Sequence, residues 1–271
     1  KAKASHYNKL SENVALSIGG YYDRNDGFFT NSFNGKKADK EESVGARMGL
    51  EWMISPRFKA TYNFSFDYSE QRAFPYGLYN PETKETAAVS INDSSTYNRR
   101  MIGNQLRLEY KSNQFTLSST TGYRHLKDNM NMDQDFSPLS IFTLNQKQKQ
   151  NAFSQEIALK SNQPTNYQWS VGLYGFYDDL HTDGPVTFKE DGVKTVLQSV
   201  FDRLKASIPR MPQLIILDEQ IYIPGSFDTP TYGLALYHQS TINNLFSEGL
   251  SLTAGIRLDY EKAEMDYHSE A

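Results

Sequence analysis

The sequence predicts an all-β fold: an antiparallel up-and-down transmembrane β-barrel, of which this chain supplies about nine long strands. Three observations predict it. Apolar and polar residues alternate with a period of two, several alternating runs exceed 10 residues, and short connections between the runs alternate with long ones. A tilted strand that crosses a bilayer needs about 9–11 residues, whereas strands of globular proteins usually have about 5–6.

The clearest alternation covers residues 58–68, where every second residue from Phe58 to Tyr68 is apolar and the residues between them are polar. Residues 44–52 and 250–260 repeat the pattern. Successive side chains of a strand point to opposite faces, so each apolar set shares one face. The same reasoning places strands over 13–22, 43–53, 57–70, 97–110, 114–128, 150–160, 166–181, 231–242 and 250–262.

The connections between these strands differ in length in a regular way. Residues 54–56, 111–113, 161–165 and 243–249 are short and carry turn residues, among them Ser55-Pro56, Ser112-Asn113, Asn162 with Pro164, and Asn243-Asn244. Residues 23–42, 71–96, 129–149 and 182–230 are long. Loops beyond about 12–15 residues are uncommon in compact domains. Four long loops at one end of a sheet are typical of outer-membrane barrels, which predicts the cell outer membrane as the location.

The side chains of the strands fit a wall between lipid and water. Aromatic residues flank the short turns, where an interfacial girdle is expected: Trp52, Phe58, Tyr110, Phe115, Tyr167 and Trp169. The other face carries charge and predicts a wide or plugged lumen: Arg47, Glu51, Arg107, Glu109, Glu156, Arg257 and Asp259.

Composition excludes several other classes. With 28 Lys+Arg against 32 Asp+Glu, spread along the chain, no nucleic-acid partner is expected. The absence of cysteine excludes a disulfide scaffold and a thiolate metal site. A mean hydropathy of −0.64 and the lack of any apolar run of about 20 residues exclude a transmembrane helix. Strict alternation hides the apolar half of the strands from this average.

One long loop contains a helical pattern. In 191–209 the apolar residues recur at helical spacing, from Val193 to Ile208. Asp191 is the expected N-cap and Pro209 the expected stop. The pattern predicts one short amphipathic helix that packs over the loops.

Four motifs resemble parts of TonB-dependent outer-membrane receptors. The segments 19–22 (GGYY), 26–31 (DGFFTN) and 35–39 (GKKAD) resemble an early barrel hairpin, and 43–47 (SVGAR) with 50–52 (LEW) resemble its returning strand. Two later hairpins are resembled by 153–159 (FSQEIAL) with 169–174 (WSVGLY) and by 232–239 (YGLALYHQ) with 250–260 (LSLTAGIRLDY). The resemblance covers most of residues 13–262, apart from the loops.

This resemblance implies a 22-strand barrel with an N-terminal plug, which imports a ferric siderophore, haem, cobalamin or a glycan with energy from the TonB complex. A ferric siderophore or haem is preferred here. The plug region, its TonB contact and the C-terminal strands are not in the sequence, so residues 1–271 are expected to be one incomplete barrel domain. Its first and last strands are then unpaired edges. The expected partners are the lipid bilayer of the outer membrane, the TonB complex through the missing plug region, and a large small-molecule nutrient.

The sequence carries no signature of catalysis. It lacks GxGxxG, GxxxxGK[ST], GxSxG and HExxH, and its five histidines are dispersed. The oxygen-rich segment 178–184 is explained by a strand end and turn. We therefore predict no enzyme, no cofactor and no metal site. The alternatives left open are another outer-membrane barrel, namely a porin-like protein, a surface protease or a glycan or cobalamin importer, and a soluble carbohydrate-binding β-sandwich.

Ligand contacts are expected in the loops and at the lumen rim. Loop aromatics over a polar lumen suit a large ligand, and arginines near loop bases attract an anionic one. The candidates are Phe28, Phe29, Tyr76, Tyr79, Arg99, Arg100 and Arg124. The alternative is that the aromatic residues pack the loops against each other, and that the arginines are ordinary charges of the lumen.

Overall fold

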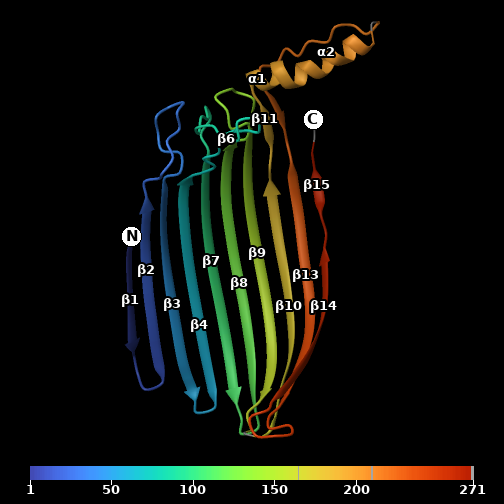
Figure 1. The fold of residues 1–271 in the computed structure, drawn as a ribbon. Coiled ribbons are helices and arrows are strands. Elements are labelled where there is room, and N and C mark those ends of the chain that lie inside the picture. Colours follow the sequence, from blue (N-terminus) through green and yellow to red (C-terminus); the bar gives the residue numbers. More distant parts are fainter. Residues whose placement is uncertain (164, 209, 270–271) are drawn as a thin grey trace.

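The computed structural model describes residues 1–163, 165–208 and 210–269. They form a 13-stranded antiparallel sheet and a separate two-stranded hairpin (Figure 1). The continuous path of the sheet consists of β1 (Ala2–Lys9), β2 (Val14–Asn25), β3 (Glu41–Ser55), β4 (Phe58–Arg72), β7 (Thr96–Lys111), β8 (Phe115–Asp133), β9 (Phe142–Ser161), β10 (Tyr167–Asp183), β13 (Ser226–Ile242) and β14 (Leu252–Ala263).

Smaller elements occupy the loop end of the molecule (Figure 1). They are β5 (Tyr79–Asn80), β6 (Glu85–Thr86), β11 (Val186–Phe188), β12 (Ile221–Ile223), β15 (Asp266–His268), α1 (Glu190–Gly192), a π-helical segment (Val193–Leu197) and α2 (Gln198–Ser207). None of the helices in the described ranges is long and apolar enough to cross a membrane.

All nine strands expected from the alternation are present, and the antiparallel all-β fold is confirmed. Several strands are longer than predicted. β9 begins at Phe142 rather than at 150, so the expected loop over 129–149 contracts to 134–141. Residues 145–150 are polar without interruption, which removes the alternation although the strand continues.

A tenth long strand, β1, was not predicted. Its sequence AKASHYNK has no apolar alternation, and every residue of it is exposed. β1 pairs with β2 from Ala2 opposite Tyr22 to Lys9 opposite Ala15. The expectation that the strand over 13–22 is an edge is therefore wrong. Among the described residues, β1 pairs only with β2 and β14 only with β13, so the sheet is open at both of these strands.

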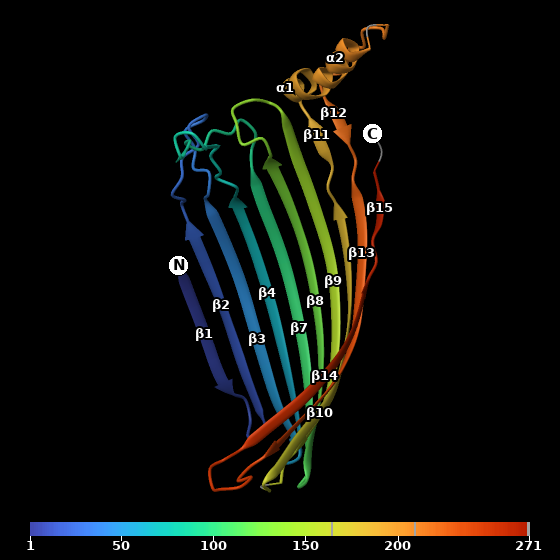
Figure 2. The same cartoon turned by 45° about the vertical axis from the view of Figure 1, so that its right-hand side comes forward.

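Short and long connections fall at opposite ends of the sheet, as predicted (Figures 1 and 2). The short ones span 10–13, 56–57, 112–114, 162–166 and 243–251, and the long ones span 26–40, 73–95, 134–141 and 184–225. Pro164, which was expected to shape one short turn, and Pro209, the expected helix stop, lie outside the described residues.

The register assigns each strand residue to one of two faces. Leu50, Tyr62 and Leu106 lie directly opposite one another on β3, β4 and β7. Ile157, Leu173 and Leu236 do so on β9, β10 and β13. We call this apolar side the outer face. Its side chains are not packed against protein, since Ile157 is 48% and Leu173 is 52% exposed. The inner face carries polar residues along its length, and the outer face also becomes polar toward the long loops, for example at Arg100 and Lys127.

Aromatic residues border the outer face in two rows. The six aromatics expected beside the short turns all lie on this face, and Phe58 is directly opposite Tyr110. A second row, the upper aromatic row, consists of Tyr123, Phe153, Tyr177 and Tyr232 on four adjacent strands. The eight residue steps from Phe115 to Tyr123 span about 26 Å of strand, or roughly 20 Å in height at a tilt of about 40°. That height approaches the apolar band of about 25 Å of an outer-membrane barrel.

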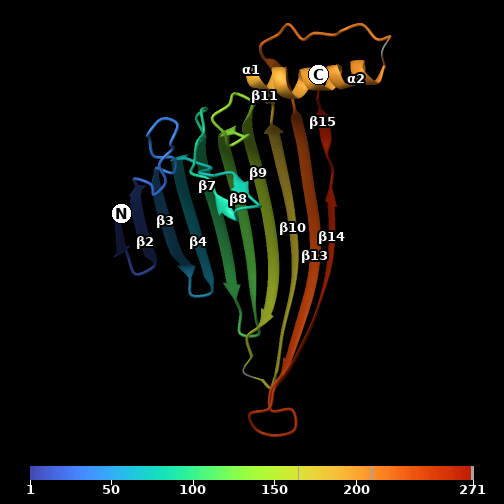
Figure 3. The ribbon, with the colours of Figure 1, turned by 45° about the horizontal axis from the view of Figure 1, so that its top comes forward.

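Buried apolar side chains lie mainly in the long loops. Among the described residues these are Ala38, Ala73, Val89, Ile91 and Val193, with Ala235 in β13 as the exception. A sheet with one face for lipid and one for water has little core of its own. The buried apolar residues are therefore mostly in the long loops, which lie at the end of the sheet opposite the short turns (Figure 3).

Candidate functional site

The inner face carries a charged cluster across β2, β3 and β4. Both oxygens of Asp67 accept hydrogen bonds of 2.9 Å from the Arg47 guanidinium, and Tyr21 Oη donates to Asp67 Oδ1 at 2.8 Å. The Tyr21 ring lies over Gly45, where an added Cβ would be 2.1 Å from Tyr21 Cε1. Glycine at 45 therefore allows an aromatic ring to lie across the wall of the lumen.

Similar chemistry recurs on the far side of the sheet. Tyr237 Oη on β13 donates to Glu156 Oε1 on β9 at 2.8 Å, bridging across β10. Nearer the long loops, Gln150 Nε2 donates to Asp178 Oδ2 at 2.7 Å. Glu156 and Asp178 each accept a hydrogen bond from a neutral side chain, and Asp178 Oδ1 has no hydrogen-bond partner among the described residues.

Between these clusters lies a hollow of about 630 Å³ against the inner face. Small side chains form its floor: Ser17, Gly49, Ser65, Gly103, Gly122 and Ser154. Arg47, Gln105, Arg124 and Asp178 supply polar groups. The hollow identifies the inner face as the concave side of the sheet. Because its side chains are small or polar, this wall leaves room for polar groups inside the lumen.

The long loops are tied together by hydrogen bonds to buried polar side chains. Asn31, which is 4% exposed, joins loop 26–40 to loop 73–95. Its Nδ2 donates to the carbonyl of Ile91 at 2.7 Å, and its Oδ1 accepts from the Ile91 N–H at 3.1 Å. Ser32 Oγ donates to the Val89 carbonyl at 2.9 Å. The first two long loops therefore form one unit.

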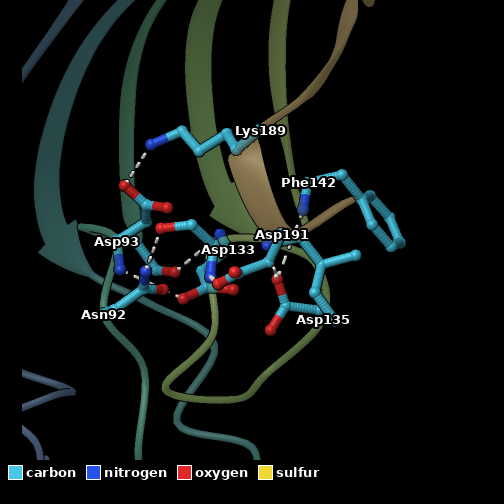
Figure 4. A network of polar contacts seen from close by, with 10 residues as sticks. Asn92, Asp93, Asp133, Asp135, Phe142, Lys189 and Asp191 are labelled. Atoms are coloured by element: carbon cyan, nitrogen blue, oxygen red, sulfur yellow. Dashed lines mark hydrogen bonds and ion pairs between the residues drawn. The ribbon is translucent and has the colours of Figure 1, made fainter. Parts of the chain in front are cut away.

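Asp133 is buried where the end of β8 meets loop 73–95 (Figure 4). It ends β8 beyond the upper aromatic row, and none of it is exposed. Its Oδ2 accepts from the Asp93 N–H at 3.1 Å, and its own N–H donates to Ser95 Oγ at 3.1 Å. Its Oδ1 has no hydrogen-bond partner among the described residues. Burial raises the pKa of this carboxyl to about 6.

The third and fourth long loops complete the network (Figure 4). Lys189 Nζ pairs with Asp93 Oδ1 at 2.5 Å, and Asn92 Nδ2 donates to Ser140 Oγ at 2.8 Å. The Ser140 N–H donates to Asp191 Oδ2 at 2.8 Å. Loops 73–95, 134–141 and 184–225 therefore share one set of polar contacts. We call these three loops, together with loop 26–40, the loop cluster.

The predicted helix is present over Glu190–Gly192, Val193–Leu197 and Gln198–Ser207. Its N-cap is Lys189, without a side-chain hydrogen bond, so the assignment of Asp191 as the cap is wrong. Asp191 lies inside the first turn and holds Ser140 instead.

Beyond its first turn the helix is not packed on the loops, contrary to expectation. Val196, Val200 and Leu204 are each at least 41% exposed, and α2 projects away from the sheet (Figures 1 and 2). The returning segment lies along it, with Gln198 Nε2 donating to the Leu214 carbonyl at 2.8 Å.

The anchored first turn gives a specific prediction. At Gly192 an added Cβ would lie 2.0 Å from the Ile141 carbonyl oxygen, and backbone atoms cannot yield as a side chain can. We expect Gly192→Ala to destabilise the attachment of the helix by about 1–3 kcal/mol, as overpacking does. Faster amide exchange at residues 189–193 would report it. Gly184→Ala is the control, since nothing lies within 4 Å of its Cβ, and unchanged exchange in both variants would contradict the prediction.

The sequence-predicted ligand residues are dispersed over the loop cluster and both faces. Phe28 and Phe29 are 80% and 53% exposed in loop 26–40, and Tyr79 is 59% exposed in β5. Tyr76 packs edge-on against Phe136 with ring centroids 5.1 Å apart. This contact joins loops 73–95 and 134–141, as the alternative interpretation of the aromatics expected.

The three arginines are divided between the faces. Arg99 and Arg124 lie on the inner face, where Arg124 Nη2 donates to Gln150 Oε1 at 3.4 Å. Arg100 lies on the outer face opposite Tyr68, away from the lumen rim where it was expected. Consecutive strand residues point to opposite sides, which explains the difference. Ligand contact by the candidates stays a prediction. Within the described ranges, no three His, Asp or Glu residues gather closely enough to hold a metal ion.

The geometry defines a class of protein: an open segment of an up-and-down barrel, with an apolar outer face, a polar inner face and long loops at one end. No protein-family model matches the sequence, and no curated protein is similar to it in sequence. Among solved structures, the ferric yersiniabactin uptake receptor FyuA from Yersinia pestis superposes with a TM-score of 0.72 at 14% identity, over 98% of this chain and 37% of FyuA.

Two further receptors give the same result. The ferric citrate transporter FecA has a TM-score of 0.64 at 9% identity, over 97% of this chain and 35% of its own. FpvA of P. aeruginosa, bound to a pyoverdine–iron complex, has 0.62 at 13% identity, over 99% and 36%. The chain thus spans just over a third of each receptor. It has the fold of part of the β-barrel of TonB-dependent siderophore receptors.

Proposed function

We propose that the chain is part of the barrel of a TonB-dependent receptor in the outer membrane of a Gram-negative bacterium. The observation that carries the proposal is the superposition of 98% of the chain on FyuA. The separation of an apolar outer face from a charged inner face supports it, because a lipid-facing wall around a wet lumen needs this separation. The protein acts by binding and transport rather than by catalysis.

The proposed cargo is a ferric siderophore or haem. FyuA, FecA and FpvA are all described with ferric ligands, which favours an iron chelate over cobalamin or a glycan. The loop cluster captures the ligand, and the inner face guides it past a plug region that the TonB complex acts on. The plug and TonB steps rest on the family resemblance.

Isothermal titration of the intact receptor tests this proposal. Ferric siderophores, haem, cobalamin and oligosaccharides are titrated separately into the detergent-solubilised protein. We expect saturable heat with one class of iron chelate and none with oligosaccharides. Binding of cobalamin or oligosaccharide alone would contradict the proposed cargo but would be consistent with the proposed receptor class. If the full-length protein has no plug region, the proposal that it is a TonB-dependent receptor is wrong.

A further inference from the structure

Arg124 on β8 differs from the other arginines on the inner face of the described strands, each of which has a carboxylate beside it. The pairs are Arg47 with Asp67 at 2.9 Å, Arg107 with Glu109 at 3.0 Å, Arg257 with Asp259 at 2.8 Å, and Arg99 with Asp128, which lies directly opposite it. Arg124 forms no ion pair among the described residues. Its Nη2 donates to the uncharged Gln150 side chain, at 3.4 Å.

The register explains why Arg124 has no carboxylate in contact. The residues directly opposite it are Gly103 on β7 and Ala152 on β9. The inner-face residues that flank these three positions are all uncharged: Met101, Gln105, Gly122, Leu126, Gln150 and Ser154. Asp178 is two strands away, opposite Ala152, and is linked to Arg124 through the Gln150 amide.

Arg124 lines the hollow of about 630 Å³, beside residues that are too small to fill it. Ser65 and Ser154 line the same hollow. Their hydroxyls lie over Gly103 and Gly122, where an added Cβ would be 2.6 and 2.7 Å from the hydroxyl oxygens. A serine hydroxyl donates one hydrogen bond, and a guanidinium carries five donors in a planar fork. The hollow therefore offers several donors and one uncompensated positive charge.

The position of the hollow suits a ligand that arrives from outside the cell. Arg124 follows Tyr123 of the upper aromatic row, so it lies on the lumen side at the outer edge of the apolar band. A ligand that leaves the loop cluster reaches it without crossing the depth of the barrel. Tyr174 and Phe176, whose ring centroids are 6.1 Å apart, line the hollow from β10 and supply an apolar contact.

We propose that this hollow is a carboxylate-binding subsite, and that the transported iron chelate presents at least one carboxylate to Arg124. The inference rests on the receptor role in the proposed function and narrows the cargo to anionic chelates. Arginine binds a carboxylate through two parallel charge-assisted hydrogen bonds, and Ser65 and Ser154 add neutral donors beside it. A carboxylate of the plug region has the same chemistry, so the test has to separate the two sources.

The test uses the full-length receptor in detergent, as the wild type and as Arg124→Gln, Arg124→Lys and Arg107→Gln. Each protein is titrated with ferric citrate, with haem and with an uncharged ferric trihydroxamate. Arg107→Gln is the matched control, because Arg107 lies on the same face of the neighbouring strand but already has Glu109 as its counter-ion. The melting temperature of each ligand-free protein is measured as well.

We expect ferric citrate or haem, which both carry carboxylates, to bind the wild type, and the uncharged chelate not to bind. Arg124→Gln should weaken the binding about ten- to hundredfold, the usual contribution of a hydrogen-bonded charged group. Arg124→Lys should retain part of the affinity and Arg107→Gln all of it. The melting temperature of the ligand-free receptor should be the same for Arg124→Gln and the wild type.

Two results would overturn the inference and leave the receptor role intact: saturable binding of the uncharged chelate, or equal affinity of the wild type and Arg124→Gln. A lower melting temperature of ligand-free Arg124→Gln with unchanged affinity would assign the arginine to a carboxylate of the plug region instead. If none of the three chelates binds, the proposed cargo is wrong as well.

Discussion

Replacement of Leu173 by arginine is expected to destabilise the barrel in a bilayer by about 2–4 kcal/mol, the cost of a cationic side chain at the midplane. Leu173 is 52% exposed on the outer face, directly opposite Ile157 and Leu236. It is four residues from Trp169 and four from Tyr177, which places it midway between the two aromatic rows. No water-filled path reaches a side chain at that depth on the lipid side.

Denaturant titration of the full-length receptor folded into vesicles measures this cost. Ser118→Arg is the matched control, since Ser118 lies on the inner face directly opposite Glu109. We expect it to change the free energy of unfolding by less than about 1 kcal/mol, because a lumenal arginine remains hydrated and gains a carboxylate neighbour. Equal destabilisation by both variants would mean that the outer face does not contact lipid.

This contrast between the faces also explains how much of the fold could be predicted from the sequence. Within the band between the aromatic rows, lipid and water impose opposite demands on alternate residues, so the alternation of 58–68 or 250–260 is strict. Outside that band both faces are wet. The first residues of β9 therefore have no alternation to reveal them. β1 pairs with residues 15–22 of β2, within the band, and its sequence still does not alternate.

Features that depend on the pairing register of the strands could not be predicted from the sequence. The lower aromatic row could be predicted because each member is next to a turn signal. Tyr123, Phe153 and Tyr177 are in mid-strand, and only the pairing aligns them. The same holds for Arg99 and Arg100, which look equivalent in sequence and lie on opposite faces.

Contacts between loops could not be predicted from the sequence either. Asp191 has the position and chemistry of an N-cap, but it bonds to Ser140, which lies 51 residues away in the sequence. Asp133 occurs in the polar segment DQD, which reads as an ordinary solvated turn. Its complete burial depends on loop 73–95 folding over it, and no local pattern encodes that approach.

The buried carboxyl of Asp133 makes the loop cluster sensitive to pH. Its pKa is about 6 in the folded chain against 3.8 for a solvent-exposed aspartate, so the folded state binds this proton more tightly than the unfolded state. Stability is therefore greatest below about pH 4, falls as the pH rises through about 6, and is then constant. The difference is about 3 kcal/mol, from a shift of about two pKa units. We expect amide exchange at residues 91–95, corrected for the intrinsic rate, to report this loss.

Asp133→Asn is expected to abolish most of this pH dependence. A carboxamide keeps an oxygen to accept from the Asp93 N–H and carries no charge into the buried site, so the loop cluster should open less often at pH 7.5 than in the wild type. Asp218→Asn, at an exposed position of the long loop 184–225, serves as the control and should reproduce the wild-type profile. If Asp133→Asn also reproduced that profile, burial of an ionised Asp133 would not be what destabilises the loop cluster at neutral pH. Other carboxylates of the cluster would then have to account for it, first of all Asp93 and Asp135, whose negative charges raise the pKa of Asp133.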